Sequence, residues 1–158
     1  MNNSLKFTLI AGASMAASLL PTFASADIYK LKCAMCHQAT GAGLPNVFPP
    51  LAESEWVNGP AINLIRIQLR GLMGPITVKG KQYNMMMPAN AAMTDAEIAS
   101  VLTYVRSNFG NKADAITAEM VKKQRTEVGK PPLTVKDLID PEKAKEAKPV
   151  KKEEPKKK

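Results

Sequence analysis

The stretch KLKCAMCHQATG, residues 30–41, decides how the whole sequence is interpreted. It contains both cysteines of the 158-residue chain, Cys33 and Cys36, and its only histidine, His37. Four kinds of site use residues of these types: a structural disulfide, a redox-active dithiol, a zinc site and a covalently attached cofactor. The remaining sequence distinguishes among them.

Three of these four kinds of site fit the sequence poorly. A structural zinc site generally needs four protein ligands, and the chain has no further cysteine or histidine to complete the shell. A thioredoxin-like dithiol lies between a strand and a helix of a parallel sheet, and the hydrophobic pattern indicates no such sheet. A structural disulfide would not require the neighbouring His37.

The spacing Cys-x-x-Cys-His is the attachment motif of a c-type haem. The two thiols add to vinyl groups at the edge of the macrocycle, and the adjacent histidine reaches the iron at its centre. We therefore predict one covalently attached haem c, held by Cys33 and Cys36, with His37 as the proximal iron ligand.

A methionine cluster offers a second iron ligand. The stretch NMMMPAN places Met85, Met86 and Met87 directly before Pro88. Electron-transfer haems often take a methionine as their second axial ligand, although methionine also serves simply to fill cofactor pockets. We expect one of the three side chains to bind the iron while its neighbours pack or lie exposed.

The first 26 residues have the pattern of a secretory signal. Lys6 precedes an apolar run over residues 7–20, and Ala24–Ala26 supply the small residues that a signal peptidase recognises. A membrane anchor is the alternative, but the run is shorter than the roughly 20 residues that span a bilayer. We expect cleavage after Ala26 or Ala24, a periplasmic mature protein and no transmembrane segment in it.

Residues 27–110 are predicted to form one small helical domain. Apolar residues recur every three or four positions over residues 61–72 and again over residues 95–109. Thr94 and Glu97 have the spacing of a capping box at the start of the second of these helices. Such a short chain has a thin hydrophobic core, which a cofactor at its centre would enlarge.

The C-terminal part differs in composition. Of the 22 basic residues, 14 lie beyond Gly110. Residues 111–140 are expected to form an extension with one short helix, and the Lys-rich residues 141–158 are expected to be disordered, because they bury too little apolar surface to offset their ordering entropy. This tail acts either as a solvated spacer or by electrostatic contact with an acidic partner or a membrane surface.

Four stretches together resemble the class I, mono-haem c-type cytochromes: CAMCH, GLPNVFPPLAESEW, NMMMPAN and EIASVLTYVRSNFG. They occur in the order typical of that family and cover residues 29–111. The resemblance implies an all-α, small cytochrome c fold, in which helices pack around one covalently attached haem. The basic tail lies outside the family pattern.

The resemblance also implies roles for individual residues. Cys33, Cys36 and His37 match the two thioether cysteines and the proximal ligand, and Met87 matches the distal ligand, which typically precedes a proline. The resemblance adds two cofactor contacts. The carbonyl group of Pro49 accepts a hydrogen bond from the ligand imidazole, and Leu51 is an apolar neighbour of the haem.

The resemblance implies two features of the crossing between the first and last helices. Tyr29 and Tyr104 match the aromatic residues at this crossing. The small residue that the family usually places there falls on Ser25, at or before the expected cleavage site. Either the crossing is looser than usual or cleavage occurs earlier.

These features predict a one-electron carrier and not an enzyme. The carrier would pass electrons between a periplasmic dehydrogenase or quinol-oxidising complex and an oxidase or another cytochrome. We expect redox proteins as partners and no nucleic acid. One alternative is a haem c subunit of a larger respiratory or dehydrogenase complex. The other is a haem enzyme or gas sensor with a free position on its iron.

Overall fold

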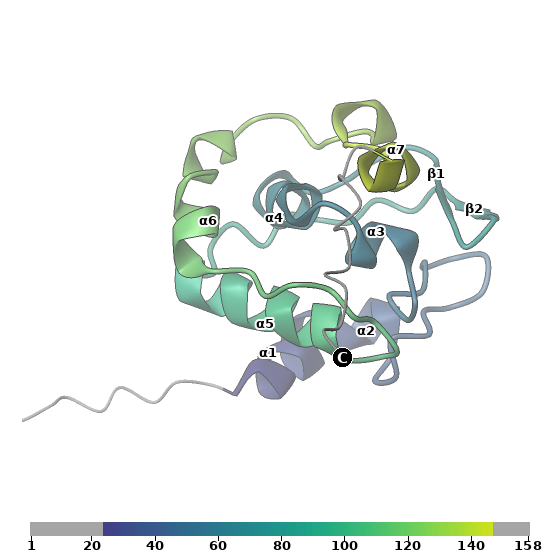
Figure 1. Ribbon diagram of the computed structural model, residues 1–158, viewed down its shortest axis with the longest axis horizontal. Coiled ribbons are helices and arrows are strands. Elements are labelled where there is room, and N and C mark those ends of the chain that lie inside the picture. The colour runs from purple at the N-terminus through teal and green to yellow at the C-terminus, as the bar shows by residue number, and fades with distance from the viewer. Residues whose placement is uncertain (1–23, 147–158) are drawn as a thin grey trace, which may run out of the picture.

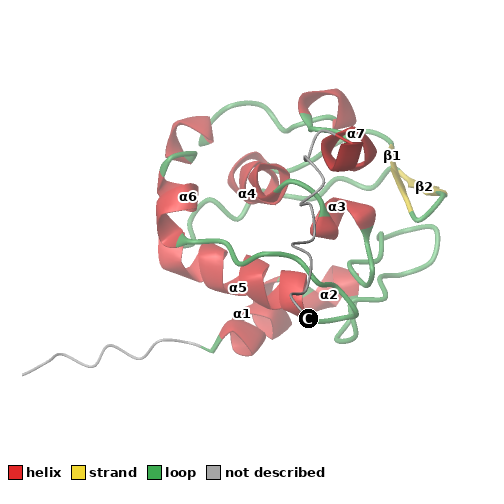
Figure 2. Ribbon diagram, viewed as in Figure 1, coloured by secondary structure: helices red, strands yellow, loops and turns green. Residues whose placement is uncertain are grey.

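The computed structural model describes residues 24–146, which are mainly helical with one two-stranded hairpin (Figure 2). The prediction of a helical fold is confirmed. None of the helices in this part of the chain is long and apolar enough to cross a membrane. The elements in order are α1 (Ser25–Lys32), α2 (Ala34–His37), α3 (Glu55–Asn58), α4 (Ala61–Arg70), β1 (Ile76–Val78), β2 (Lys81–Tyr83), α5 (Asp95–Ser107), α6 (Ala118–Lys122), the 3₁₀ turns η1 (Arg125–Glu127) and η2 (Val135–Asp137), and α7 (Pro141–Glu146).

The first and last helices of the predicted domain, α1 and α5, pack against each other (Figure 1). The rings of Tyr29 and Tyr104 meet where they cross, with centroids 5.6 Å apart, and the ring centroid of Phe109 lies 5.0 Å from that of Tyr29. The Tyr29 hydroxyl donates to the carbonyl oxygen of Gln38 at 2.7 Å, so the aromatic cluster also ties the crossing to the end of α2.

Helix α1 includes Ser25, which bears on where the chain is cleaved. Cleavage after Ala26 would remove the first two residues of α1, whereas cleavage after Ala24 would leave the helix whole. The apolar run of the predicted signal peptide lies outside the described residues.

Helix α5 begins as the sequence predicts. The backbone amide of Glu97 donates to the Thr94 hydroxyl oxygen at 3.2 Å, and the Glu97 carboxylate accepts from the Thr94 amide at 2.8 Å. These reciprocal bonds satisfy amide groups that have no partner within the helix. The buried stripe of α5 consists of Ile98, Val101, Leu102 and Val105. Helix α5 packs against α1, and all members of the stripe except Ile98 also line a central pocket.

Helix α4 runs through the centre of the fold and buries Ile65 and Leu69. It ends at Arg70, and the C-cap residue Gly71 has a φ of 78°. A Cβ atom at this position would lie 2.6 Å from the carbonyl oxygen of Met87. Glycine is therefore needed both for the left-handed backbone and for the close approach of the methionine segment.

The short hairpin β1–β2 pairs Ile76 with Tyr83 and lies at one side of the molecule (Figure 1). Trp56 connects the hairpin to α3, because its indole nitrogen donates to the carbonyl oxygen of Thr77 at 2.8 Å. The Glu55 carboxylate accepts from the backbone amide of Lys79 at 2.9 Å. These bonds hold the hairpin against the body of the domain.

The C-terminal extension differs most from expectation, because it packs on the domain. Residues 111–146 pass from the end of α5 through α6 and then over the top of the molecule to α7 (Figure 1). Ile116, Val121 and Leu133 on this segment are buried, with exposed fractions of 4%, 0% and 0%. Part of the segment predicted to be disordered forms helix α7; the rest, residues 147–158, lies outside the described residues.

Candidate functional site

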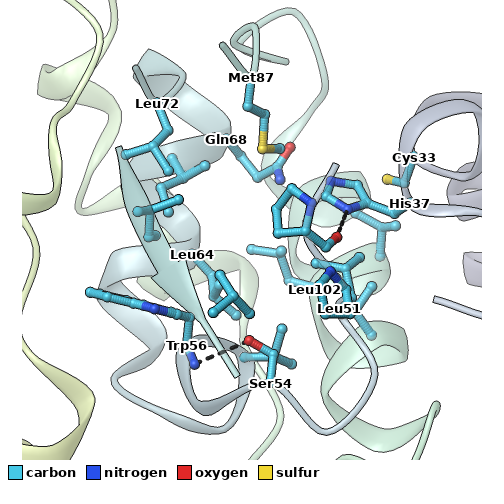
Figure 3. A pocket seen from close by; sticks show the side chains of 18 residues that line it. Cys33, His37, Leu51, Ser54, Trp56, Leu64, Gln68, Leu72, Met87 and Leu102 are labelled. Carbon is cyan, nitrogen blue, oxygen red and sulfur yellow. Dashed lines mark hydrogen bonds between the residues drawn. The ribbon is translucent and has the colours of Figure 1, made fainter. Parts of the chain in front are cut away.

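A largely apolar pocket lies between α2, α3, α4, α5 and the connecting loops (Figure 3). Five of the six predicted site residues border the pocket: Cys33, His37, Pro49, Leu51 and Met87. They come from segments that are far apart in the sequence.

The two cysteines lie at and within the short helix α2. Cys33 borders the pocket, and Cys36 lies three residues further on with a partly exposed side chain. Both thiols are free, so the structure contains no disulfide between them. Burial, and to a lesser extent the nearby Cys36 thiol, raises the pKa of Cys33 to about 11. Cys33 is therefore a neutral thiol at physiological pH.

His37 is 7% exposed and is held in one orientation. Its ring nitrogen Nδ1 lies 3.0 Å from the carbonyl oxygen of Pro49. Because a carbonyl oxygen only accepts, Nδ1 carries the proton, and Nε2 keeps a lone pair for a metal ion. Burial lowers the pKa of His37, with the Pro49 hydrogen bond opposing it, so the imidazole is neutral at physiological pH.

Of the three consecutive methionines, only Met87 borders the pocket, and its side chain extends into it (Figure 3). Met85 and Met86 are 55% and 59% exposed. The backbone of Met87 is paired with Leu72: each amide nitrogen donates to the other residue's carbonyl oxygen at 2.9 Å. This pairing fixes the Met87 backbone next to the C-terminal end of α4.

The pocket also contains a polar residue that the sequence interpretation missed. Gln68 is 6% exposed and borders the pocket from α4. Its side-chain oxygen accepts from Asn90 Nδ2 at 2.9 Å, and its backbone carbonyl oxygen accepts from the Asn90 amide at 2.7 Å. The sequence did contain a signal for this residue. Gln68 follows Leu64 by four residues, so it places a polar side chain on an otherwise apolar helix face.

This set of donors fits a c-type haem. The described residues contain no group of three or more His, Cys, Asp or Glu side chains that could bind a metal ion by themselves. They do offer two free thiols, one oriented neutral imidazole and one thioether at or beside a single apolar pocket. An iron ion bound here would need further ligands, which the nitrogen atoms of a haem provide.

Comparison with known proteins agrees with this arrangement. The family model described as cytochrome c matches residues 24–109. The chain belongs to the cytochrome c family. It is a class I c-type cytochrome, and this family membership implies a c-type haem with iron as its cofactor.

Individual relatives of this cytochrome fall into two groups. One group consists of small cytochromes, such as a cytochrome c-552 of Thermus thermophilus, which is 39% identical over 130 residues, covering 77% of this chain and 87% of the relative. A second Thermus thermophilus cytochrome c-552 is 42% identical over 109 residues, covering 63% of this chain and 82% of the relative. The other group consists of subunits of larger complexes.

An example from that group is the cytochrome c subunit of the quinone-dependent alcohol dehydrogenase of Gluconacetobacter polyoxogenes. It is 32% identical over 103 residues, which cover 63% of this chain but only 22% of the relative. The cytochrome domain therefore occurs both in small cytochromes and as one part of longer subunits.

Proposed function

We propose that this cytochrome is an exported one-electron carrier with a single haem, attached through Cys33 and Cys36 and ligated by His37 and Met87. The observation that carries the proposal is that His37 and Met87, 50 positions apart in the sequence, border the same apolar pocket as Cys33. The haem iron, when bound, supplies the one-electron couple. The protein supplies the ligands, their orientation and the exclusion of water.

Each side chain has a specific task in this proposal. The Pro49 carbonyl orients the His37 ring and makes it more basic. The Met87 thioether favours the reduced state of the iron and so raises the reduction potential. Leu51 and the other apolar residues around the pocket keep the site dry. If His37 and Met87 both bind the haem iron, no free position would remain on it for a substrate, which favours a carrier over an enzyme.

The export pattern and the relatives support a cellular role in the periplasm. A cleaved signal peptide would place the protein in the periplasm, between a dehydrogenase or quinol-oxidising complex as donor and an oxidase or another cytochrome as acceptor. Relatives include a cytochrome c subunit of an alcohol dehydrogenase and the CcoP subunit of a cbb3-type oxidase of Rhodobacter capsulatus. A second candidate function, a haem subunit of such a complex, is supported by these relatives.

Spectroscopy of the purified holoprotein tests the proposal. We expect the oxidised protein to show the iron–sulfur charge-transfer band that only methionine ligation produces, and the reduced protein to bind no carbon monoxide. Rapid carbon monoxide binding or peroxide turnover in the wild type would contradict the proposal and favour a haem enzyme or gas sensor. Co-purification with a membrane complex would favour the subunit role.

A further inference from the structure

We propose that the C-terminal extension, residues 111–146, positions Met87 for the iron and thereby sets how readily this ligand dissociates. This inference rests on the proposed ligation by Met87. The segment that follows residue 83 and leads to α5 carries the methionine, and the extension contacts this segment both directly and through the end of α4. We call residues 84–94 the ligand loop.

The first contact reaches Met87 through one intermediate residue. Leu133, which is fully buried, donates its amide to the carbonyl oxygen of Gly71 at 3.1 Å and accepts from the amide of Met73 at 2.8 Å. Leu72, between these two residues, forms the paired backbone bonds to Met87 at 2.9 Å. The extension, the end of α4 and the ligand loop therefore form three adjacent backbone segments, with the Leu72 segment in the middle.

The second contact is direct and involves Arg125. Its guanidinium group donates to the carbonyl oxygens of Ala91 at 2.8 Å and Met93 at 2.6 Å, and to the Asp95 carboxylate at 2.6 Å. The planar fork of an arginine fixes the directions of all three bonds at once. Arg125 thus holds the C-terminal half of the ligand loop at the point where it enters α5.

The extension is also bonded to helix α4. The Glu127 carboxylate lies 2.8 Å from Arg70 and 3.3 Å from Arg66, both on α4, and Arg70 also donates to the carbonyl oxygen of Pro131 at 2.8 Å. An anchored extension can resist displacement of the ligand loop. Displacement of this loop would carry Met87 away from the iron, so the backbone bonds of Leu133 and the bonds of Arg125 oppose the opening of the iron–sulfur bond.

Displacement of Met87 by imidazole in the ferric holoprotein tests the inference. In Arg125→Gln, which loses the bonds to the ligand loop, we expect imidazole to displace the methionine roughly tenfold faster and the reduction potential to fall. The matched control is Arg66→Gln. Arg66 binds the Asp137 carbonyl and Glu127 but no residue of the ligand loop, so its displacement rate should stay near that of the wild type.

The outcomes separate this inference from the proposed function. If the iron–sulfur band is absent from the wild type, both fail. If the band is present and the rate of displacement by imidazole rises in both variants only in proportion to their loss of global stability, the positioning role is overturned and ligation by Met87 stands.

A measurement on the wild type avoids reliance on variants that fold poorly. The amides of Met87 and Leu133 should share one rate of opening in native-state hydrogen exchange, because they belong to the same backbone assembly. Independent opening of the two amides would overturn the inference.

Discussion

The ring nitrogen Nδ1 of His37 donates to the carbonyl oxygen of Pro49, 12 residues along the chain, at 3.0 Å. The acceptor belongs to the backbone, so substitution of the side chain at position 49 does not remove it. The backbone amide of Gly43 in turn donates to the His37 carbonyl oxygen at 3.0 Å, within the same loop. These two bonds orient the ring and leave Nε2 as the nitrogen that can act as a ligand.

Covalent attachment of the cofactor should depend on the two cysteines. In Cys33→Ala/Cys36→Ala, no thiol remains to form a thioether, because these are the only cysteines of the chain. Haem should then be extracted completely by acidified acetone, whereas it stays with the wild-type protein. The measurement is haem staining of the protein on a denaturing gel. Haem that stays attached to the double variant would contradict the predicted linkage.

Leu133 should contribute strongly to stability although it lies in the C-terminal extension. Its side chain is fully buried, so Leu133→Ala should lower the free energy of unfolding by about 2–5 kcal/mol. The control is Ile139→Ala on the same extension, where the side chain is 46% exposed and the loss should be below about 1 kcal/mol. Denaturant titration of the holoprotein measures both. Equal losses would mean that Leu133 does not anchor the extension.

Glu127 should make stability depend on acidic pH. Its pKa is lowered from 4.5 to about 2 by hydrogen bonds from Lys130, Arg70 and Arg66. Because the folded pKa lies below the unfolded value, the contribution is complete above pH 4.5 and is lost as the pH falls from there towards 2. At neutral pH, Glu127→Gln should cost about 1–3 kcal/mol.

Thermal unfolding at several pH values checks this expectation. The difference in midpoint between the wild type and Glu127→Gln should shrink steadily below about pH 4.5, where protonation removes the charge in the wild type as well. The difference in midpoint between the wild type and Arg66→Gln should change less with pH than the difference for Glu127→Gln, because Arg70 and Lys130 still lower the pKa of the Glu127 carboxyl group. A difference that is constant across this pH range would show that the charge of Glu127 is not what stabilises the fold.

Local sequence patterns predicted the core well, because the interactions that form it are local. The Thr94–Glu97 capping box is confirmed at the start of α5. The five residues of the motif that ends in His37 lie in helix α2 and at its N-cap, Cys33. The resemblance to class I cytochromes supplied the rest of the site residues, and the structure places most of them at one pocket.

The short helix expected in the extension is present as α6, but the packing of the extension on the domain escaped prediction for a physical reason. Leu133 is a single apolar residue after two prolines, and one buried side chain produces no periodicity in the sequence. Its partners Gly71 and Met73 lie about 60 positions earlier, and backbone hydrogen bonds to them carry no side-chain pattern. Arg125 likewise appeared as one more charge in a basic segment, although it binds two carbonyl groups. Such contacts are set by tertiary packing alone.

The choice of the distal ligand among three consecutive methionines can be argued from backbone geometry. Pro88 biases the residue before it towards an extended conformation, and the paired bonds to Leu72 hold Met87 in place. Along an extended segment, neighbouring side chains point in opposite directions, so Met86 faces away from the side that Met87 faces. Met85 is 55% exposed and does not border the pocket as Met87 does.

Met87→Ala should therefore abolish the iron–sulfur charge-transfer band and lower the reduction potential. A lost methionine ligand typically lowers the potential because the thioether favours the reduced iron. Met85→Ala and Met86→Ala are matched controls in the same segment, and both should keep the band and a potential close to that of the wild type. If another single variant loses the band while Met87→Ala retains it, the assignment of the ligand is wrong, although a haem with methionine ligation would still be an electron carrier. If none of the three variants changes the band, Met73 and Met93 become the candidates, and the ligand loop would have to bind in a different register from the one that its pairing with Leu72 imposes.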